Sequence, residues 1–479
     1  MSIRKNAVYN MAYRVFSLLL PLVTAPYLSR VVGTEGVGLY DYAWNISYVF
    51  VLVGMLGLEN YGVRAIARVR DDVDQLNRTF SEIWRMQLLV AGVTLLVWLG
   101  YVFLVAGDER PIALHLTLMS VSCLVNLDWC LMGLDQFRPI ALRNTAVKLA
   151  GAAAIFLLVR QKGDLWLYAL VWSAATMLGC LSCWTTLRGR VKLIRVPWKD
   201  ALKHLPPCAM LFVSVIAVSV YRRMDVIMLG AMCGWEPNGL YGGAEKIIYC
   251  LSGFISAIGT VMLPQASALM KKGQTDTLKR RIALSMDLMM CMTAALAFGL
   301  SSVAEDFAPL FFGEDFAYSG TLMIPLAFTL MTIGFANVVR TQWVLPSGQD
   351  RILIRSVVTG ACVNLALNAV CIPRLGAMGA VVGTLAAETA VPLVQWLHLR
   401  RKLSYGKYCF SCAAYSLIGG VMLIAVRLTG KCLPFGGWMR LGTQVAVGAA
   451  VYVLLTLGYW KITGKQEAIS LLRRGKKRS

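Results

Sequence analysis

The chain has 479 residues, of which 58% are hydrophobic, and its 47 Lys and Arg against 25 Asp and Glu give a formal net charge of +22. This hydrophobic content is enough for roughly fourteen membrane-crossing helices of about 20 residues each, and it excludes a soluble globular domain. The sequence has no glycine-rich phosphate loop and no Walker lysine, so it also excludes an ATPase.

Apolar runs along the chain predict fourteen membrane spans. The first six are residues 8–28, 40–58, 86–106, 112–133, 141–159 and 165–187. The next six are residues 206–232, 240–263, 282–303, 321–339, 356–372 and 377–397, and the last two are 410–426 and 441–460. We expect the first run to be a retained helix, because Pro26 would directly follow its best cleavage-like site.

The basic residues predict the orientation of these spans. If the N-terminus is inside, most Lys and Arg fall in cytoplasmic segments, so both termini are expected in the cytoplasm. The outward turn 304–320 has no Lys or Arg and carries four acidic residues, Glu305, Asp306, Glu314 and Asp315. The net charge is then explained by loops and a tail beside an anionic lipid leaflet, and nucleic acid is not an expected partner.

One short pattern occurs twice. Residues 35–43 read "EGVGLYDYA" and residues 236–244 read "EPNGLYGGA", which share E-x-x-G-L-Y-x-x-A. Six predicted spans separate the copies, and an even number preserves orientation, so we predict two halves related by a near two-fold axis along the membrane normal. Gly38 and Gly239 are expected to allow a tight exit from a turn, and Tyr40 and Tyr241 to lie at the membrane interface.

The repeat sets the predicted domain boundaries. Residues 1–204 form an N-terminal six-helix half and residues 205–402 a C-terminal six-helix half, with the basic segment 188–203 as the linker between them. Residues 403–479 add two transmembrane helices and a basic cytoplasmic tail. Two facing six-helix halves are typical of transporters that open alternately to either side.

Three stretches carry a family resemblance: "NAVYNMAYRVFSLLLPLVTAPYLSRVVGTEGVGLYDYA", "LGLENYGVRAIARVRDD" and "DVIMLGAMCGWEPNGLYGGAEKI". They resemble the polysaccharide-transporter flippases, which carry O-antigen, capsule or exopolysaccharide repeat units and belong to the multidrug/oligosaccharidyl-lipid/polysaccharide superfamily. The resemblance covers essentially the whole chain. It implies an all-α polytopic membrane protein with about fourteen helices arranged as six, six and two, and a cationic central cavity for a lipid-linked sugar headgroup.

Polar residues at membrane depth are costly and therefore mark candidate sites. Five in the first span recur on one helical face that we expect to line a wet cavity: Asn6, Asn10, Arg14, Ser17 and Thr24. Of these, Asn10 and Arg14 are candidates for binding the substrate. The alternative for Arg14 is that its side chain snorkels to the cytoplasmic interface.

The seventh span carries Arg222, Arg223 and Asp225 near its middle. Arg222 and Asp225 are three residues apart and can form an ion pair, which leaves Arg223 directed elsewhere. An internally neutralised pair that only fixes helix packing is the alternative. Because an arginine can grip two oxygens of a diphosphate, Arg222 and Arg223 are candidate headgroup ligands.

Glu388 lies near the middle of the twelfth span, with no cation three or four residues away. A carboxylate at that depth can exchange a proton, so Glu388 is the candidate for coupling transport to a proton or sodium gradient. Asn364 and Asn368 of the eleventh span are expected to face it, although hydrogen bonding between helices explains them equally well. Asp128, nearer the inner side, can lie in the cavity or at the interface.

The remaining motifs predict no chemistry. The pairs Cys180/Cys183 and Cys409/Cys412 have C-x-x-C spacing but no second pair and no histidines at zinc-ligand spacing, so neither a metal nor a cofactor is expected. Gly379 and Gly383 form a G-x-x-x-G motif that predicts close helix packing.

The predicted function is a flippase that moves a polyprenyl-diphosphate-linked oligosaccharide to the outer leaflet of the bacterial plasma (inner) membrane by gradient-coupled alternating access. The alternatives are a drug exporter or lipid II flippase of the same superfamily and, from another class, a membrane polysaccharide polymerase or ligase. A polymerase or ligase usually needs a large outer loop with catalytic residues, whereas the longest outer turn here is the short segment 304–320, so an enzyme is not expected. The expected partners are the lipid-linked substrate, the lipid bilayer and polysaccharide polymerase machinery.

Overall fold

The computed structural model describes the backbone of residues 3–465 and, except at 3–19, 213–215, 217, 218, 220 and 221, their side chains. In that part of the chain every regular element is a helix, as expected for backbone that must satisfy its own hydrogen bonds in lipid. Eleven of these helices are long and apolar enough to cross a membrane, and Arg110–Val125 is a shorter apolar helix. The protein is therefore an all-α polytopic membrane protein.

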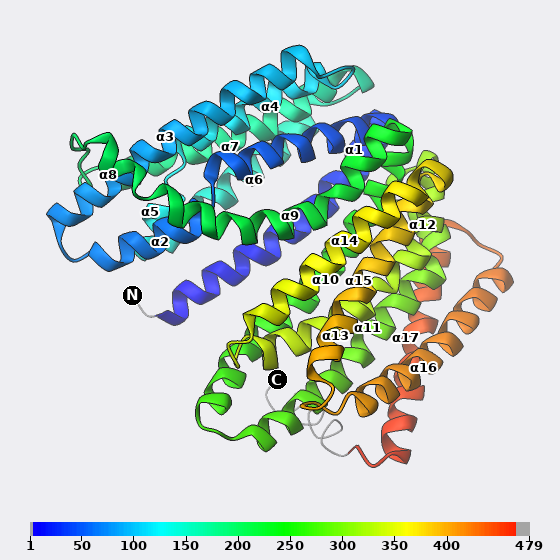
Figure 1. The fold of residues 1–479 in the computed structure, drawn as a ribbon. Helices are drawn as coiled ribbons and strands as arrows, with labels where there is room; N and C mark the ends of the chain where they lie inside the picture. Colours follow the sequence, from blue (N-terminus) through cyan, green and yellow to red (C-terminus); the bar gives the residue numbers. More distant parts are fainter. Residues whose placement is uncertain (1–2, 466–479) are drawn as a thin grey trace. The chain divides into compact units, whose positions relative to one another are not determined.

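The chain divides into two compact units, Met1–Gly239 and Leu240–Ser479. Within the first unit, α1 packs against α3, α4, α6 and α9, and α7 packs against α4 and α6 (Figure 1). Its helices are α1 (Ile3–Met55), α2 (Leu58–Val69), α3 (Val73–Leu104), α4 (Arg110–Val125), α5 (Asp128–Gly133), α6 (Phe137–Leu158), the 3-10 turn η1 (Lys162–Asp164), α7 (Leu165–Leu187), α8 (Trp198–Leu202) and α9 (Leu205–Cys233).

In the second unit, α11 packs against α12, α13, α16 and α17, and α14 packs along α15 (Figure 1). Its elements are the 3-10 turn η2 (Glu314–Phe316), the π-helical turn η3 (Arg340–Val344) and the helices α11 (Thr275–Phe312), α12 (Ala317–Ala327), α13 (Thr329–Val339), α14 (Asp350–Leu375), α15 (Ala377–Leu399), α16 (Tyr405–Cys432) and α17 (Gly437–Ile462). Helix α10 (Trp235–Lys271) begins in the first unit and continues into the second.

Four predicted spans have a different local form. The first two are joined in α1, which kinks at Gly33. The fourth breaks at Asn126, whose backbone is extended and whose side chain accepts a 3.0 Å hydrogen bond from the amide of Asp128, so that α4 and α5 are separate helices. The tenth is divided between α12 and α13 at Phe328 and ends in η3.

The repeat extends to a pair of glycines that the pattern did not include. Gly33 has φ 73° and ψ −176°, and Gly234 has φ 84° and ψ −167°, and each stands five residues before the Gly of the shared motif. Only glycine adopts this backbone region without strain. The expectation that Gly38 and Gly239 shape the turn is wrong: both lie inside helices, and Gly33 and Gly234 make the bends.

The tyrosines of the repeat are buried, which corrects the prediction that they lie at the membrane interface. Tyr40 is 6% exposed and packs on Tyr168 of α7 with ring centroids 4.5 Å apart. Tyr241 is fully buried, and its hydroxyl lies 2.9 Å from Thr384 Oγ1 of α15. Since α7 and α15 are the sixth and twelfth predicted spans, the two copies make equivalent contacts in their own units.

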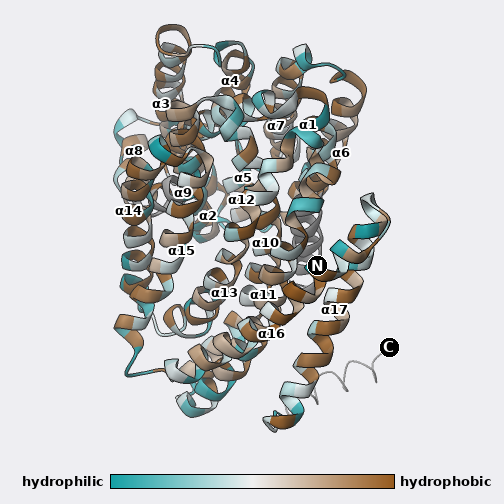
Figure 2. Cartoon of the chain, turned by 90° about the vertical axis from the view of Figure 1, so that its right-hand side faces the viewer, coloured by the Kyte–Doolittle hydropathy of each residue, from teal (hydrophilic) through white to brown (hydrophobic). Residues whose placement is uncertain are grey.

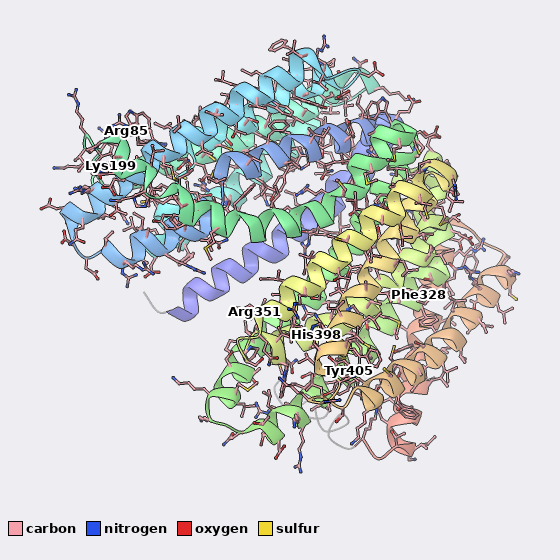
Figure 3. The ribbon with its side chains drawn as sticks, in the orientation of Figure 1. Arg85, Lys199, Phe328, Arg351, His398 and Tyr405 are labelled. Atoms are coloured by element: carbon pink, nitrogen blue, oxygen red, sulfur yellow. The ribbon has the colours of Figure 1, made fainter. Side chains whose placement is uncertain are left out.

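The basic segment 188–203 is docked on α3 of the first unit. Two of its backbone amides donate to Asn77 and Ser81 of α3, at 2.7 and 3.0 Å. Arg85 stacks over the ring of Trp198 at 4.0 Å, at the end of the unit where Figure 3 labels Arg85. The compact units divide within α10 instead of near residue 204, and the predicted halves 1–204 and 205–402, with the extra segment 403–479, stay predictions.

A buried carboxylate fixes the end of this segment. Glu82 of α3 is 2% exposed and lies 3.0 Å from Arg78 Nε, 2.8 Å from Lys203 Nζ and 3.0 Å from His204 Nε2. Tyr61 Oη lies 2.6 Å from His204 Nδ1. This geometry suits a neutral ring that accepts a hydrogen bond from Tyr61 and donates one to Glu82, so His204 joins α2 and α3 to the start of α9.

Helices α16 and α17 are attached to α11 near both of its ends. Ser411 and Tyr415 of α16 donate to the buried carboxylate of Asp287, at 2.7 and 2.9 Å, and Lys465 pairs with the same group. Asp306, farther along α11, accepts a 3.0 Å hydrogen bond from Gln444 of α17. Figure 2 shows the apolar character of these helices, with brown residues along most of α17 and α3.

Candidate functional site

Arg223 of α9 is directed toward the second part of α1. Its Nη1 donates a 2.6 Å hydrogen bond to Asn45 Oδ1, and its guanidinium carbon lies 3.6 Å from the centre of the Tyr48 ring. The Asn45 amide is itself oriented, because its Nδ2 donates to the Asp41 carbonyl at 2.7 Å. The side chain is half-buried, so the structure places this cation inside the helix bundle.

Arg222 and Asp225 differ in their environment. Arg222 is exposed, whereas Asp225 is only 4% exposed. Their spacing of three residues on α9 is compatible with an ion pair, and the predicted pairing stays a prediction. Arg222 and Arg223 point to different sides of α9, so Arg223 is the better placed of the two for a site beside α1.

Asn10 and Arg14 lie in α1, but their side chains fall outside the described residues, and their predicted place in the cavity stays a prediction. Farther along the same predicted face, Thr24 is 3% exposed and donates to the Leu20 carbonyl at 3.3 Å. Thr24 is therefore satisfied within its own helix.

Asp128 belongs to a charge pair that the sequence analysis missed. Arg143 Nη2 lies 2.9 and 3.1 Å from its two carboxylate oxygens, and Cys183 Sγ lies 3.1 Å from Oδ1. The side chains of Arg143 and Asp128 are 13% and 22% exposed. Cys183 is a buried free thiol. The pair joins α5, α6 and α7, so structural neutralisation explains Asp128 well.

Asn364 and Asn368 lie where α14 and α15 are in closest contact. Both are buried, and Asn368 Nδ2 donates to Asn364 Oδ1 at 3.1 Å. A methyl group on Gly383 would come within 2.0 Å of Asn368 Oδ1, and one on Gly379 within 2.4 Å of a backbone carbonyl of α14. The packing role predicted for the two glycines is confirmed, because only glycine fits at these contacts.

Glu388 is half-buried on α15, five residues beyond Gly383. It lies one helical turn after Thr384, whose hydroxyl contacts Tyr241 of α10. This spacing places Glu388 on the side of α15 that faces α10, rather than on the glycine face that packs against α14. Lys246, a half-buried cation of α10, lies in the turn that follows Tyr241.

Sequence reasoning missed three residues that contact the predicted site residues: Arg143, Asn45 and Tyr48. Arg143 interrupts an apolar run and could have been found by the cost of an intramembrane charge. Asn45 and Tyr48 are spaced three residues apart in a predicted span, but nothing in the sequence pairs them with Arg223. That pairing depends on the packing of α9 against α1.

The family model for polysaccharide biosynthesis proteins matches residues 3–270, more than half of the chain. The chain belongs to this family. The family model of the lipid II flippase MurJ also matches, over residues 246–435. These matches confirm the family that the sequence resemblance indicated.

Relatives of this polysaccharide biosynthesis family member are named as transporters. A protein of Shigella dysenteriae named as an O-antigen transporter is 24% identical over 402 residues, which cover 81% of this chain and 98% of that protein. A protein of Haloferax volcanii named as a low-salt glycan biosynthesis flippase is 23% identical over 61% of this chain and 62% of its own length. Neither name describes a catalytic activity, in agreement with the prediction that the protein is not an enzyme.

Solved structures confirm the fold. A lipid II flippase MurJ in an inward closed conformation aligns with a TM-score of 0.77 and 13% identity, over 96% of this chain and all of that chain. An inward-facing multidrug resistance MATE family transporter aligns with a TM-score of 0.60 and 14% identity, over 85% of this chain and 96% of that chain. At these low sequence identities, the structural similarity shows the fold alone.

Proposed function

We propose that the protein is a flippase that moves a polyprenyl-diphosphate-linked oligosaccharide from the cytoplasmic to the outer leaflet of the bacterial inner membrane by alternating access. The observation that carries the proposal is the match to an O-antigen transporter over 98% of that protein's length. The relative named as a glycan biosynthesis flippase supports the same substrate class. Both termini lie in the cytoplasm in this proposal, because the basic residues favour that orientation.

Arg223 is the proposed ligand of the diphosphate, with Arg222, Arg14 and Asn10 as further candidates. Its contacts with Asn45 and Tyr48 of α1 support this role, because they hold a half-buried guanidinium between two helices. A diphosphate presents several charged oxygens, and arginine binds such groups with paired hydrogen bonds.

Glu388 is the proposed coupling carboxylate. Its half-buried position on α15 is suited to a carboxylate that exchanges a proton or sodium ion. Asn364 of α14 packs against the glycine face of α15 instead of the Glu388 side, so its proposed part is to hold these two helices together. Asp225 and Asp128 are proposed to act by charge pairing, and the Arg143 contact supports that role for Asp128.

Transport in proteoliposomes tests the proposal. A fluorescent lipid-linked oligosaccharide is placed in the inner leaflet, and its arrival in the outer leaflet is followed with and without imposed proton and sodium gradients. We expect the parent protein to move the lipid, Arg223→Ala to reduce the rate at least tenfold, and Glu388→Gln to lose the response to the gradient. Absence of movement by the folded parent would contradict the flippase, and an unchanged gradient response of Glu388→Gln would contradict the coupling role.

A lipid II flippase is the second candidate, because the MurJ family model matches residues 246–435. The same vesicles distinguish the two when they contain lipid II in place of the oligosaccharide lipid. Preferential movement of lipid II would favour the second candidate. If the oligosaccharide lipid is preferred, polysaccharide polymerase machinery in the same membrane is the proposed partner that receives it.

A further inference from the structure

Five residues of α1 form a contact face toward α9 and the start of α10, here named the α1 seam. They are spaced at four, four, three and three residues, which keeps them on one side of the helix. The α1 seam consists of Thr34, Gly38, Tyr42, Asn45 and Tyr48. All of its contacts described below lie within the first unit.

One end of the seam is a contact between backbones. A methyl group added to Gly38 would lie 1.8 Å from the carbonyl oxygen of Trp235, and one added to Gly239 would lie 2.0 Å from the carbonyl oxygen of Thr34. Asn238 is fully buried and donates to the Gly38 carbonyl at 2.8 Å. The two copies of the repeat therefore touch each other, and the helices approach as closely as glycine permits.

The middle of the seam is aromatic. The rings of Tyr42 and Trp235 have centroids 5.1 Å apart, and a methyl group added to Gly230 would lie 2.6 Å from the Tyr42 ring. This part is close-packed and apolar. It carries no charged side chain that could bind an anionic ligand.

At the other end of the seam, the contact is made by a charged side chain, Arg223, instead of by backbone or apolar rings. Arg223 is a cation that contacts the seam directly, and it is held by one neutral amide oxygen and one ring face. Stacking on Tyr48 leaves the in-plane N–H groups of a guanidinium available for other acceptors. A diphosphate oxygen is a stronger acceptor than an amide oxygen, because it carries negative charge and a phosphate group can accept two parallel hydrogen bonds from one guanidinium.

We propose that Tyr48 positions Arg223 for an anionic diphosphate headgroup, and that the bound headgroup takes the Arg223 hydrogen bond away from Asn45. This inference rests on the proposed function, and it assigns roles to two residues that contact Arg223 instead of the substrate. Loss of the Asn45 contact leaves the seam closed by its glycine part, its aromatic part and the stacking of Arg223 on Tyr48. Headgroup binding thereby loosens the attachment of α9 to α1.

The proposal predicts different results for removal of the Tyr48 ring and removal of the Asn45 amide. Tyr48→Leu removes the ring and should weaken diphosphate binding about tenfold, whereas Tyr48→Phe keeps the ring and should bind as the parent does. Asn45→Asp gives Arg223 a competing carboxylate and should also weaken binding about tenfold. Asn45→Ala removes the competitor and should bind as tightly as the parent or a few times more tightly.

Calorimetric titration of the full-length protein in detergent measures these affinities, with geranylgeranyl diphosphate as the probe and geranylgeraniol as the uncharged control. Asn60→Asp is the matched control variant, because it adds the same charge at an exposed position of α2. Hydrogen exchange of peptides covering residues 34–48 and 223–239 gives a second readout. Exchange should increase when the diphosphate is added to the parent, and should not change with Arg223→Ala.

The outcomes separate this inference from the proposed function. If Arg223→Ala loses diphosphate binding while Tyr48→Leu and Asn45→Asp bind as the parent does, the positioning roles are wrong and the arginine site stands. If Arg223→Ala binds the diphosphate as the parent does, Arg223 is not the headgroup ligand and both proposals lose that residue. Slower hydrogen exchange of the seam peptides on diphosphate binding would contradict the proposal that headgroup binding loosens the attachment of α9 to α1.

Discussion

The Asp128 carboxylate and the Arg143 guanidinium lie 2.9 Å apart and are mostly buried. Removing one partner of such a pair leaves a desolvated charge, whereas replacing both with apolar groups is often tolerated. At Gly38 the constraint is steric, because the neighbouring backbone leaves no room for a side chain. Each of these residues leads to a prediction about stability.

Asp128→Ala should destabilise the protein by roughly 2–4 kcal/mol, because Arg143 then stays buried without its carboxylate. The double variant Asp128→Ala with Arg143→Met should recover part of this loss. The melting temperature in detergent, followed by fluorescence-detected size exclusion, measures both. Equal melting temperatures for Asp128→Ala and the parent would show that the pair does not contribute to stability.

Gly38→Ala should destabilise by about 1–3 kcal/mol or prevent folding, because the new methyl group would lie 1.8 Å from the Trp235 carbonyl oxygen. Gly92→Ala in α3 is the matched control, since nothing lies within 4 Å of its added methyl group. That control should be unchanged or stabilised by up to about 1 kcal/mol. The yield of monodisperse protein and its melting temperature measure the difference, and similar behaviour of the two variants would contradict close packing at Gly38.

At the scale of elements, short polar clusters determine where connecting segments lie. The segment 188–203 is fixed to α3 by backbone hydrogen bonds and by the group around Glu82. His204 lies in this group at the start of α9, and burial lowers its pKa below the usual value, with partial compensation from Glu82. The position of α9 at its first turn therefore depends on a titratable contact.

The lowered pKa predicts the direction of a pH effect. An unfolded chain protonates His204 near pH 6.5, and the folded protein does so only at lower pH, so stability is complete above about pH 6.5 and is lost as the pH falls through the lowered pKa. The melting temperature should therefore fall between pH 7.5 and 5.5, and it should fall less in His204→Gln. His398→Gln, at an exposed position, is the control. An identical pH dependence of His204→Gln and the parent would exclude the contribution of His204.

At the scale of the whole molecule, the internal repeat is the main organising feature. Gly33 and Gly234 bend the chain with nearly equal dihedral angles, and Tyr40 and Tyr241 contact the sixth and twelfth spans of their own units. Gly38 and Gly239 contact each other directly within the first unit. The near two-fold rotation between the halves stays a prediction.

Reporter fusions test the predicted orientation of the chain. A fluorescent protein fused to the C-terminus should fluoresce, and alkaline phosphatase fused there should be inactive, because the basic tail is predicted to remain in the cytoplasm. Phosphatase inserted after Gly313, in the acidic connection between α11 and α12, should be active. An insertion in the segment 188–203 is the inactive control, and phosphatase activity at the C-terminus would reverse the predicted topology.

The sequence by itself determined the class of protein, because about 20 consecutive apolar residues have few alternatives to crossing a membrane as a helix. Its count of fourteen spans stays a prediction beside the eleven span-length apolar helices in the described part of the chain. The sequence also identified the repeat, the family and the packing role of Gly379 and Gly383. The contacts of the site residues were harder to predict from the sequence. Arg223, Glu388 and Asp128 were identified as costly intramembrane charges, but their surroundings could not be read from spacing within one helix.

Only the tertiary structure decided which side chains meet. Arg223 contacts Asn45 and Tyr48 from far along the chain, and Asp128 contacts Arg143 and Cys183 on two other helices. Helical periodicity specifies which face of a helix is polar, but the neighbour of that face depends on how the helices pack. The burial of Tyr40, which the sequence analysis placed at the interface, has the same physical cause: a tyrosine suits both environments, and packing against α7 determines which one it occupies.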